Sequence, residues 1–174
     1  VWRGASISND GMIICLGTWN GPFQMYYSSD GGDTWGGVNP QGVPPGSGFN
    51  VNNGIAYSDD GLTLYSIFYT AVVGTSDSWK SVNGGATWTQ IVGGGLPTPL
   101  ETRGVNCINC NDTGQYVMIA GMRYFPTRYT LCRSSDYGAT WNIIITDIKQ
   151  WYRVAISSNG SYITVGAINE YLYT

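Results

Sequence analysis

The amino-acid sequence predicts an all-β fold made of repeated four-stranded units, and three observations support this prediction. The same eight-residue stretch occurs as SSDGGDTW, SVNGGATW and SSDYGATW, and its closing tryptophans, at positions 35, 88 and 141, are a constant 53 residues apart. A second repeated stretch, of alternating polarity and ending in glycine, precedes each copy of the first. The chain contains 25 glycines and 14% aromatic residues, which is typical of turn-rich β-structure. Because internal periods of about 40 to 50 residues are characteristic of propeller blades, we predict a β-propeller.

Each repeat begins with a predicted strand that ends at a glycine turn. Apolar residues alternate along it with small or polar ones, as Ile55 and Tyr57 do on either side of Ala56. This period of two indicates a β-strand. The four copies read ASISNDG at residues 5–11, IAYSDDG at 55–61, INCNDTG at 108–114 and VAISSNG at 154–160.

Further strands are predicted after each glycine turn. Mostly apolar residues at the third and fifth positions past the glycine indicate a second strand, a third strand runs into the eight-residue stretch, and a fourth follows its tryptophan. Two positions before the first serine of that stretch stand Tyr26, Trp79 and Cys132, and we expect Leu172 to be their equivalent in the last repeat. Each unit is therefore a four-stranded antiparallel meander.

The chain is predicted to form one propeller segment over residues 1–174, with blades at about 1–39, 53–92, 104–146 and 152–174. The fourth repeat has three predicted strands and no copy of the eight-residue stretch. Three complete blades and most of a fourth cannot easily close into a ring, and open sheet edges invite further pairing. We therefore expect further blades, from another copy or from a longer chain.

The eight-residue stretch has the chemistry of a structured turn. Its Asp, or Asn in the second copy, can accept hydrogen bonds from backbone N–H groups of the turn, and its glycine suits a positive φ. We predict a structural role, in which each stretch staples the third and fourth strands of one blade. The residues are Ser28, Asp30, Gly32, Thr34 and Trp35, then Ser81, Asn83, Gly85, Thr87 and Trp88, then Ser134, Asp136, Gly138, Thr140 and Trp141.

The pattern Ser-x-Asp-x-Gly-x-Thr-Trp resembles the Asp box, or BNR repeat, of sialidases, sortilin-type receptors, photosystem II assembly factors and some plant-cell-wall hydrolases. Asn83 departs from that pattern. The resemblance implies a β-propeller whose boxes lie away from the ligand face and take no part in catalysis. The stretch AISSNGSYITVGA, together with SSDYGATW, is also similar to uncharacterised Asp-box proteins of giant DNA viruses and aquatic microbes.

Ligand-binding residues are expected on the face opposite the boxes. Loops between second and third strands and the blade-to-blade connections build that face, and such longer, variable segments commonly carry binding residues. Aromatic rings there could stack on sugars or anchor a protein partner, or else fill gaps between blades. The candidates are Arg3, Trp19, Phe23, Tyr69, Arg103, Arg123, Tyr124, Phe125, Arg128, Trp151 and Arg153.

Three of these arginines raise an enzymatic alternative. Arg3, Arg103 and Arg153 stand at or just before predicted innermost strands. In sialidases, which the boxes resemble, three arginines hold the substrate carboxylate, a contact suited to the guanidinium fork. The Arg-Ile-Pro motif that usually opens those enzymes is absent here.

The carboxylates do not complete such a site. Glycoside hydrolysis needs two facing carboxylates, and the only glutamates are Glu101 and Glu170. Asp77 and Asp147 are expected in loops of the ligand face, but no convincing pair can be assigned. No catalytic residue is predicted, and a sialidase-like glycoside hydrolase fragment is kept as the alternative hypothesis.

Charge and composition argue against several other classes. A net charge of −3 with eight Lys and Arg gives no basic stripe, so nucleic acid is not an expected partner. No apolar run approaches the roughly 18 residues of a membrane span, and no signal peptide is visible. The chain has no histidine, and the single Cys107–Cys110 pair lacks the partners of a zinc site. We expect no metal or other cofactor, and free cysteines.

The sequence favours a non-catalytic propeller that binds a glycan or a protein, or acts as a scaffold, at a surface. An extracellular or virion location is expected for such a module. A third possibility is a purely structural oligomer, in which copies of the chain complete one another.

Overall fold

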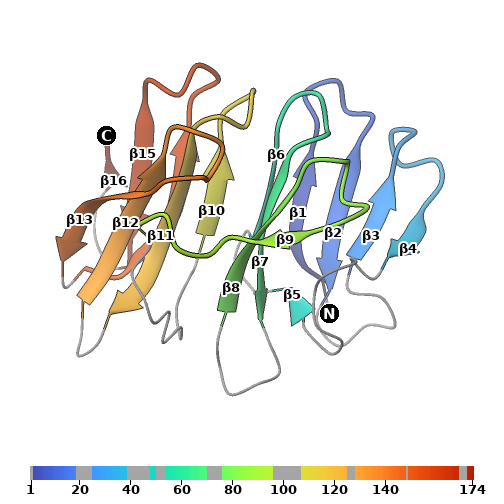
Figure 1. The fold of residues 1–174 in the computed structure, drawn as a ribbon. Coiled ribbons are helices and arrows are strands. Elements are labelled where there is room, and N and C mark those ends of the chain that lie inside the picture. Colours follow the sequence, from blue (N-terminus) through green and yellow to red (C-terminus); the bar gives the residue numbers. More distant parts are fainter. Residues whose placement is uncertain are drawn as a thin grey trace.

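A computed structural model describes residues 2–18, 25–38, 48–49, 54–69, 76–95, 107–124, 128–147, 149–168 and 172–174. Within these residues the chain forms strands and turns and no helix. Every strand pairing found there is antiparallel. The all-β prediction is therefore confirmed (Figure 1).

The sheets follow the sequence repeats. The first sheet has the order β1 (Trp2–Ile7), β2 (Ile14–Thr18), β3 (Met25–Ser28) and β4 (Gly36–Val38). The third repeat has the same order in β10 (Cys107–Cys110), β11 (Val117–Tyr124), β12 (Arg128–Ser134) and β13 (Asn142–Asp147). The last repeat shows three strands, β14 (Trp151–Ile156), β15 (Ile163–Ala167) and β16 (Leu172–Tyr173).

The second repeat carries one strand more than predicted. Its sheet contains β6 (Ile55–Tyr57), β7 (Leu64–Tyr69), β8 (Ser76–Ser81) and β9 (Thr89–Gln90), together with β5 (Gly48–Phe49). Both β5 and β6 pair with the same edge of β7, β5 near its end at Tyr69 and β6 near its start at Leu64. The sequence did not predict β5, because the connection that contains it has no alternating pattern.

The four sheets are arranged as the blades of a β-propeller. Their innermost strands lie next to one another in chain order, β1 beside β6, β6 beside β10, and β10 beside β14. The remaining strands of each blade extend outward from this row (Figure 1). Two four-stranded sheets, the five-stranded sheet of the second repeat and the three strands of the last repeat agree with the predicted propeller fold.

Packing between blades defines two faces for each blade. We call the side that contacts the preceding blade the front face, and the opposite side the back face. The front face of the second blade packs Ile55, Leu64 and Trp79 against Cys15 and Met25 of the first. The third blade's front face packs against the back face of the second, and the fourth blade's against that of the third. The hydrophobic core is thus divided into three layers between successive blades.

The register corrects one detail of the sequence alignment. Leu16 pairs with Tyr26, and the equivalent Val165 pairs with Tyr173. Tyr173 packs at the core beneath the front face of the fourth blade, whereas Leu172 is 73% exposed. Tyr173, and not Leu172, is therefore the equivalent of Tyr26. The prediction was one residue off because the fourth repeat has no eight-residue stretch from which to count.

Candidate functional site

The eight-residue stretches form closed networks of hydrogen bonds. In the first, the Ser28 hydroxyl donates to Asp30 Oδ1 (2.7 Å) and accepts from the N–H of Gly32 (2.9 Å). Asp30 Oδ1 also accepts from the N–H of Thr34 (2.9 Å), and its Oδ2 accepts from the Thr34 hydroxyl. Trp35 Nε1 donates to the Gly32 carbonyl (2.9 Å). The same bonds recur around Asp136 in the third stretch.

The second stretch reproduces this network without a charge. Asn83 Oδ1 accepts from the N–H of Thr87 (2.9 Å), while its Nδ2 donates to the Thr87 hydroxyl (2.9 Å). In the other two stretches the threonine hydroxyl, the threonine N–H and the serine hydroxyl lower the pKa of Asp30 and of Asp136 to about 2. These carboxylates are therefore ionised at neutral pH and bonded within their own turns.

The turns between first and second strands lie at the same end of the blades as these stretches. In the second blade the Ser58 hydroxyl donates to Asp60 Oδ1 (2.5 Å), which also accepts from the N–H of Leu62 (2.9 Å). Leu62 in turn accepts from the N–H of Gly84 (3.0 Å) in the adjoining stretch. The first and third blades make the equivalent backbone bond. This end of the molecule, at the top of Figure 1, is therefore held by its own hydrogen bonds.

Every carboxylate side chain that the structure describes lies at this turn end: Asp10, Asp30, Asp33, Asp59, Asp60, Asp112 and Asp136. Asp59 and Asp112 sit on neighbouring turns, where the Asp59 N–H donates to the Asp112 carbonyl (2.6 Å). Desolvation, followed by the charge of Asp112, raises the pKa of Asp59. Among the described side chains no group of three or more residues is placed to hold a metal ion.

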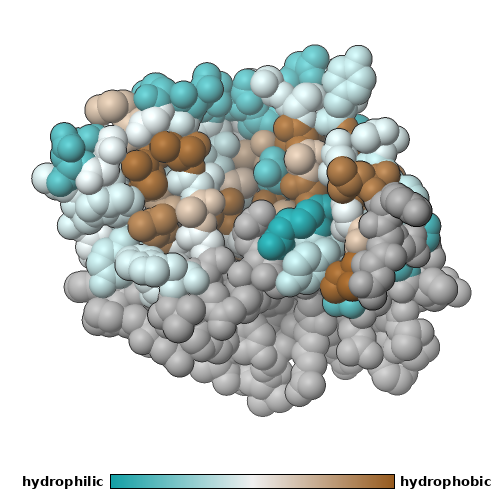
Figure 2. Space-filling view, turned by 180° about the vertical axis from the view of Figure 1, so that it is seen from behind, coloured by the Kyte–Doolittle hydropathy of each residue, from teal (hydrophilic) through white to brown (hydrophobic). Residues whose placement is uncertain are grey.

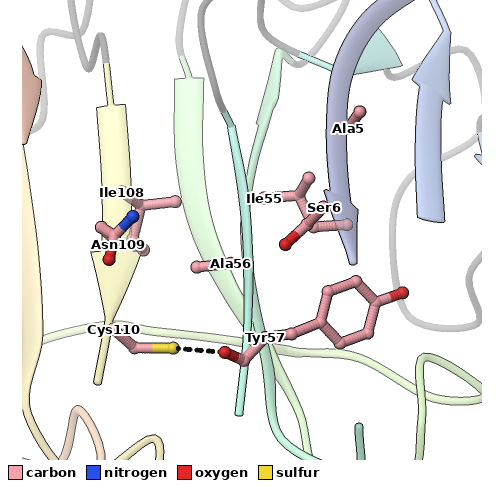
Figure 3. A pocket seen from close by; sticks show the side chains of 8 residues that line it. All are labelled: Ala5, Ser6, Ile55, Ala56, Tyr57, Ile108, Asn109 and Cys110. Carbon is pink, nitrogen blue, oxygen red and sulfur yellow. Dashed lines mark hydrogen bonds between the residues drawn. The ribbon is translucent and has the colours of Figure 1, made fainter. Parts of the chain in front are cut away.

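A small cavity lies between the innermost strands β1, β6 and β10 (Figure 3). Its volume is about 190 Å³, below the roughly 300 Å³ at which typical ligand pockets begin. Mostly apolar side chains line it, together with the polar Ser6 and Asn109, and the Cys110 thiol donates to the Tyr57 carbonyl (3.2 Å). Among the described side chains, no charged group lines this cavity.

All four cysteines are free and buried. Burial raises the pKa of Cys15 and Cys110 to about 12 and that of Cys132 to about 11, and it also raises the pKa of Cys107. A thiol is nucleophilic only as the thiolate. These side chains therefore act as small apolar core residues.

Several predicted ligand-binding residues reach the end opposite the boxes. The backbone places Tyr69 at the end of β7, and Tyr124 at the end of β11 directly opposite Arg128 of β12. Arg3 lies on β1 and Arg123 on β11. Trp19, Phe23, Arg103 and Phe125 lie outside the described residues.

Trp151 is not an exposed ring, as a ligand contact would require. It is 2% exposed and packs in the layer between the third and fourth blades, with its ring edge-on to Tyr173 at 5.4 Å. Arg153 is half-buried, and its guanidinium lies 4.7 Å from the centre of the Tyr152 ring. Lys149 and Tyr173 form a second pair of a cation and an aromatic ring, with Lys149 Nζ donating to the Tyr173 hydroxyl (2.7 Å). No local pattern predicts this pair, because the two residues are far apart in the chain.

Comparisons with known proteins support the fold class. No family model and no curated protein sequence matches the chain. A GH74 xyloglucanase from Xanthomonas campestris is similar in structure, with a TM-score of 0.68 and 16% identity over 97% of this chain and 27% of that chain. YCF48 bound to a D1 peptide has a TM-score of 0.63 and 16% identity over 97% of this chain and 52% of that chain. A chain of a nidogen–laminin complex has a TM-score of 0.63 and 13% identity over 96% of this chain and 57% of that chain.

These likenesses, at identities of 16% or less, show the fold alone. The fold and its neighbours define the class of protein as a β-propeller. The chain spans between 27% and 57% of the length of the three chains compared. In the part of the chain that the structure describes, no helix is long and apolar enough to cross a membrane.

Proposed function

We propose that this chain is a non-catalytic Asp-box propeller segment that binds a polypeptide or a glycan at the end opposite its boxes. The proposal includes membership of the Asp-box family, whose pattern three stretches follow, and an extracellular or virion-surface location. Binding or scaffolding, and not bond cleavage, is the activity we assign to it.

One observation carries this proposal: the carboxylate side chains that the structure describes all lie at the turn end, while Asp77 of β8 and Asp147 of β13 are placed at the opposite end by their backbone alone. At the turn end, aspartates such as Asp30 and Asp136 are bonded within their own turns, so they are not positioned as an acid and a base around a substrate at the other end. The opposite end instead collects Tyr69, Tyr124 and Arg128. Tyrosine and arginine are enriched at the energetic centres of protein interfaces, and aromatic rings also stack on sugars.

The structural neighbours are consistent with both hypotheses. YCF48 was solved with a D1 peptide and another neighbour belongs to a nidogen–laminin complex, so similar propellers contact polypeptides. A further neighbour is a glycoside hydrolase, which keeps the hydrolase alternative open to test.

The test combines a binding screen with a hydrolysis assay on the whole chain. Labelled protein is applied to a glycan array and to a peptide array, and the best ligand is titrated against Tyr69→Ala and a Tyr124→Ala/Arg128→Ala double variant. We expect both to weaken binding by about tenfold or more. Leu62→Ala, at a 53% exposed residue of the turn end, is the matched control and should bind like the wild type.

Two outcomes would overturn the proposal. Turnover of fluorogenic glycosides or sialosides would favour the hydrolase alternative. Loss of binding in Leu62→Ala, with normal binding in the other variants, would move the site to the turn end.

A further inference from the structure

The front face of the first blade is an apolar surface against which no other blade packs among the described residues. Trp2 is 61% exposed, Ile7 58% and Trp35 42%, while Ile14, Leu16 and Tyr26 are half-buried. Trp2 and Tyr26 stack edge-on with ring centres 5.3 Å apart. Figure 2, which looks at the molecule from behind, shows hydrophobic residues gathered on the side of the first blade, at the left of that view.

The equivalent face is covered in the later blades. Tyr57, at the position of Ile7, is 8% exposed, and Trp88, at the position of Trp35, is 4% exposed. Trp141 of the third blade is also 4% exposed. In each case the back face of the preceding blade lies over these residues. The three interfaces within the chain therefore define the kind of surface that packs against a front face.

A side chain and a glycine interlock at each of these interfaces. The residue two positions after the turn glycine of one blade contacts the turn glycine of the next, so that Ile13 meets Gly61, Thr63 meets Gly114 and Tyr116 meets Gly160. A Cβ on Gly61 or Gly160 would overlap the incoming side chain. Each turn glycine after the first is thus a socket filled by the blade before it.

The two ends of the row leave one socket and one side chain unmatched. A Cβ added to Gly11 would have Ile7 Cδ1 of its own blade as its nearest neighbour, at 4.0 Å. Tyr162, the fourth-blade equivalent of Tyr116, is 77% exposed, and Leu172 beside it on the back face is 73% exposed. Met25, at the position of Leu172, is 1% exposed because the second blade covers it.

We propose that the front face of the first blade binds the back face of the fourth blade of a second copy of this chain, with Tyr162 of one copy in the socket at Gly11 of the other. The contact continues the three interfaces already present within the chain, and the same chain carries both complementary surfaces. It does not depend on the ligand proposed above. Two copies joined through two such contacts bring together twice four blades, within the usual four to eight, as a closed head-to-tail ring.

Substitutions on the two faces test the proposal by light scattering of the purified chain across a dilution series. The wild type should have twice the 18.9 kDa mass of one chain. Ile7→Lys and Leu172→Lys each damage one of the two surfaces, and each should run as a single chain. Mixed in equal amounts, they should form a dimer, because the intact back face of the first variant meets the intact front face of the second. Tyr162→Ala should weaken the dimer about tenfold.

Val92→Lys is the matched control, since this exposed apolar residue follows β9 of the second blade, and it should remain dimeric. Circular dichroism verifies that each variant is folded. A single-chain mass for the wild type would overturn the proposal. So would a dimer that Ile7→Lys disrupts and Leu172→Lys does not, because first-blade faces would then pair with each other. A longer polymer disrupted by both substitutions would support the same contact in a non-closing form.

Discussion

Asp30, Asn83 and Asp136 occupy the same position of the repeated turn, where the two aspartates are charged and Asn83 is neutral. The aspartates accept two hydrogen bonds from one threonine, whereas Asn83 accepts one and donates the other. The turn therefore requires a side-chain oxygen that accepts from the threonine N–H. The second side-chain atom, which bonds the threonine hydroxyl, can be either an acceptor or a donor. Negative charge at this position is dispensable for the geometry.

Replacing Asp30 and Asp136 together by Asn should make folding less sensitive to acid. Their pKa values of about 2 lie below the value of about 3.9 for an unfolded Asp. The lowered pKa contributes stability that is fully present above the unfolded value and is lost as the pH falls toward about 2. Thermal unfolding midpoints measured from pH 6 to pH 2 should therefore fall less in the double variant. The midpoint of Asn83→Asp should fall more than that of the wild type. Equal falls in the wild type, the double variant and Asn83→Asp would show that these carboxylates do not link folding to pH.

Trp88 and Trp35 end equivalent turns in different surroundings. Trp88→Ala should lower the free energy of unfolding by about 3 to 5 kcal/mol, the usual cost of truncating a buried aromatic, because Trp88 is 4% exposed. Trp35→Ala should cost clearly less, because Trp35 is 42% exposed. Urea unfolding should be measured in an Ile7→Lys background, which keeps the first-blade face uncovered. Equal costs for the two substitutions would refute the argument.

At the scale of elements, the connection after β9 passes over the third eight-residue stretch. The Gly94 carbonyl accepts from the N–H of Trp141 (2.5 Å), and a Cβ on Gly94 would overlap the Ala139 carbonyl oxygen. Gly93 has the same positive φ but no atom within 4 Å of a Cβ. The connection thus joins the outer edges of the second and third blades.

This pair of glycines separates backbone strain from steric overlap. Gly93→Ala should cost about 1 to 2 kcal/mol, the penalty for a left-handed backbone. Gly94→Ala should cost about 1 to 3 kcal/mol more, since the added methyl group must displace the backbone of Ala139 and Thr140. Chemical denaturation of both variants measures the difference, and equal costs would show that the connection yields easily.

The strands show how far local pattern reaches. Strands such as β7 and β11 were predictable, because alternation and turn chemistry act over a few residues. The short β5 was not, because its two residues are recruited by the edge of β7 and carry no pattern of their own. Local pattern also failed in the last repeat, where Leu172 was predicted to be the equivalent of Tyr26 and the strand register shows that Tyr173 is.

At the scale of the whole molecule, the candidate site was harder to predict than the fold. The sequence placed Tyr69, Tyr124 and Arg128 at one end of the blades, which the strand registers agree with. It left open whether Trp151 contacts a ligand or fills a gap between blades, and the structure packs this ring against the third blade. Whether an aromatic residue binds a ligand or fills a gap depends on the neighbouring blade, which no local pattern encodes.

The sequence by itself determined the repeat, the meander of each blade and the hydrogen-bonded turns, because each of these follows from residues close together in the chain. Only the tertiary structure decided which faces are covered. Trp35 and Trp88 close the same turn, yet one is exposed and the other is buried. The difference lies outside the turn, in whether another blade packs against it. Burial is a property of two surfaces in contact, and here the second surface lies roughly one whole repeat away along the chain.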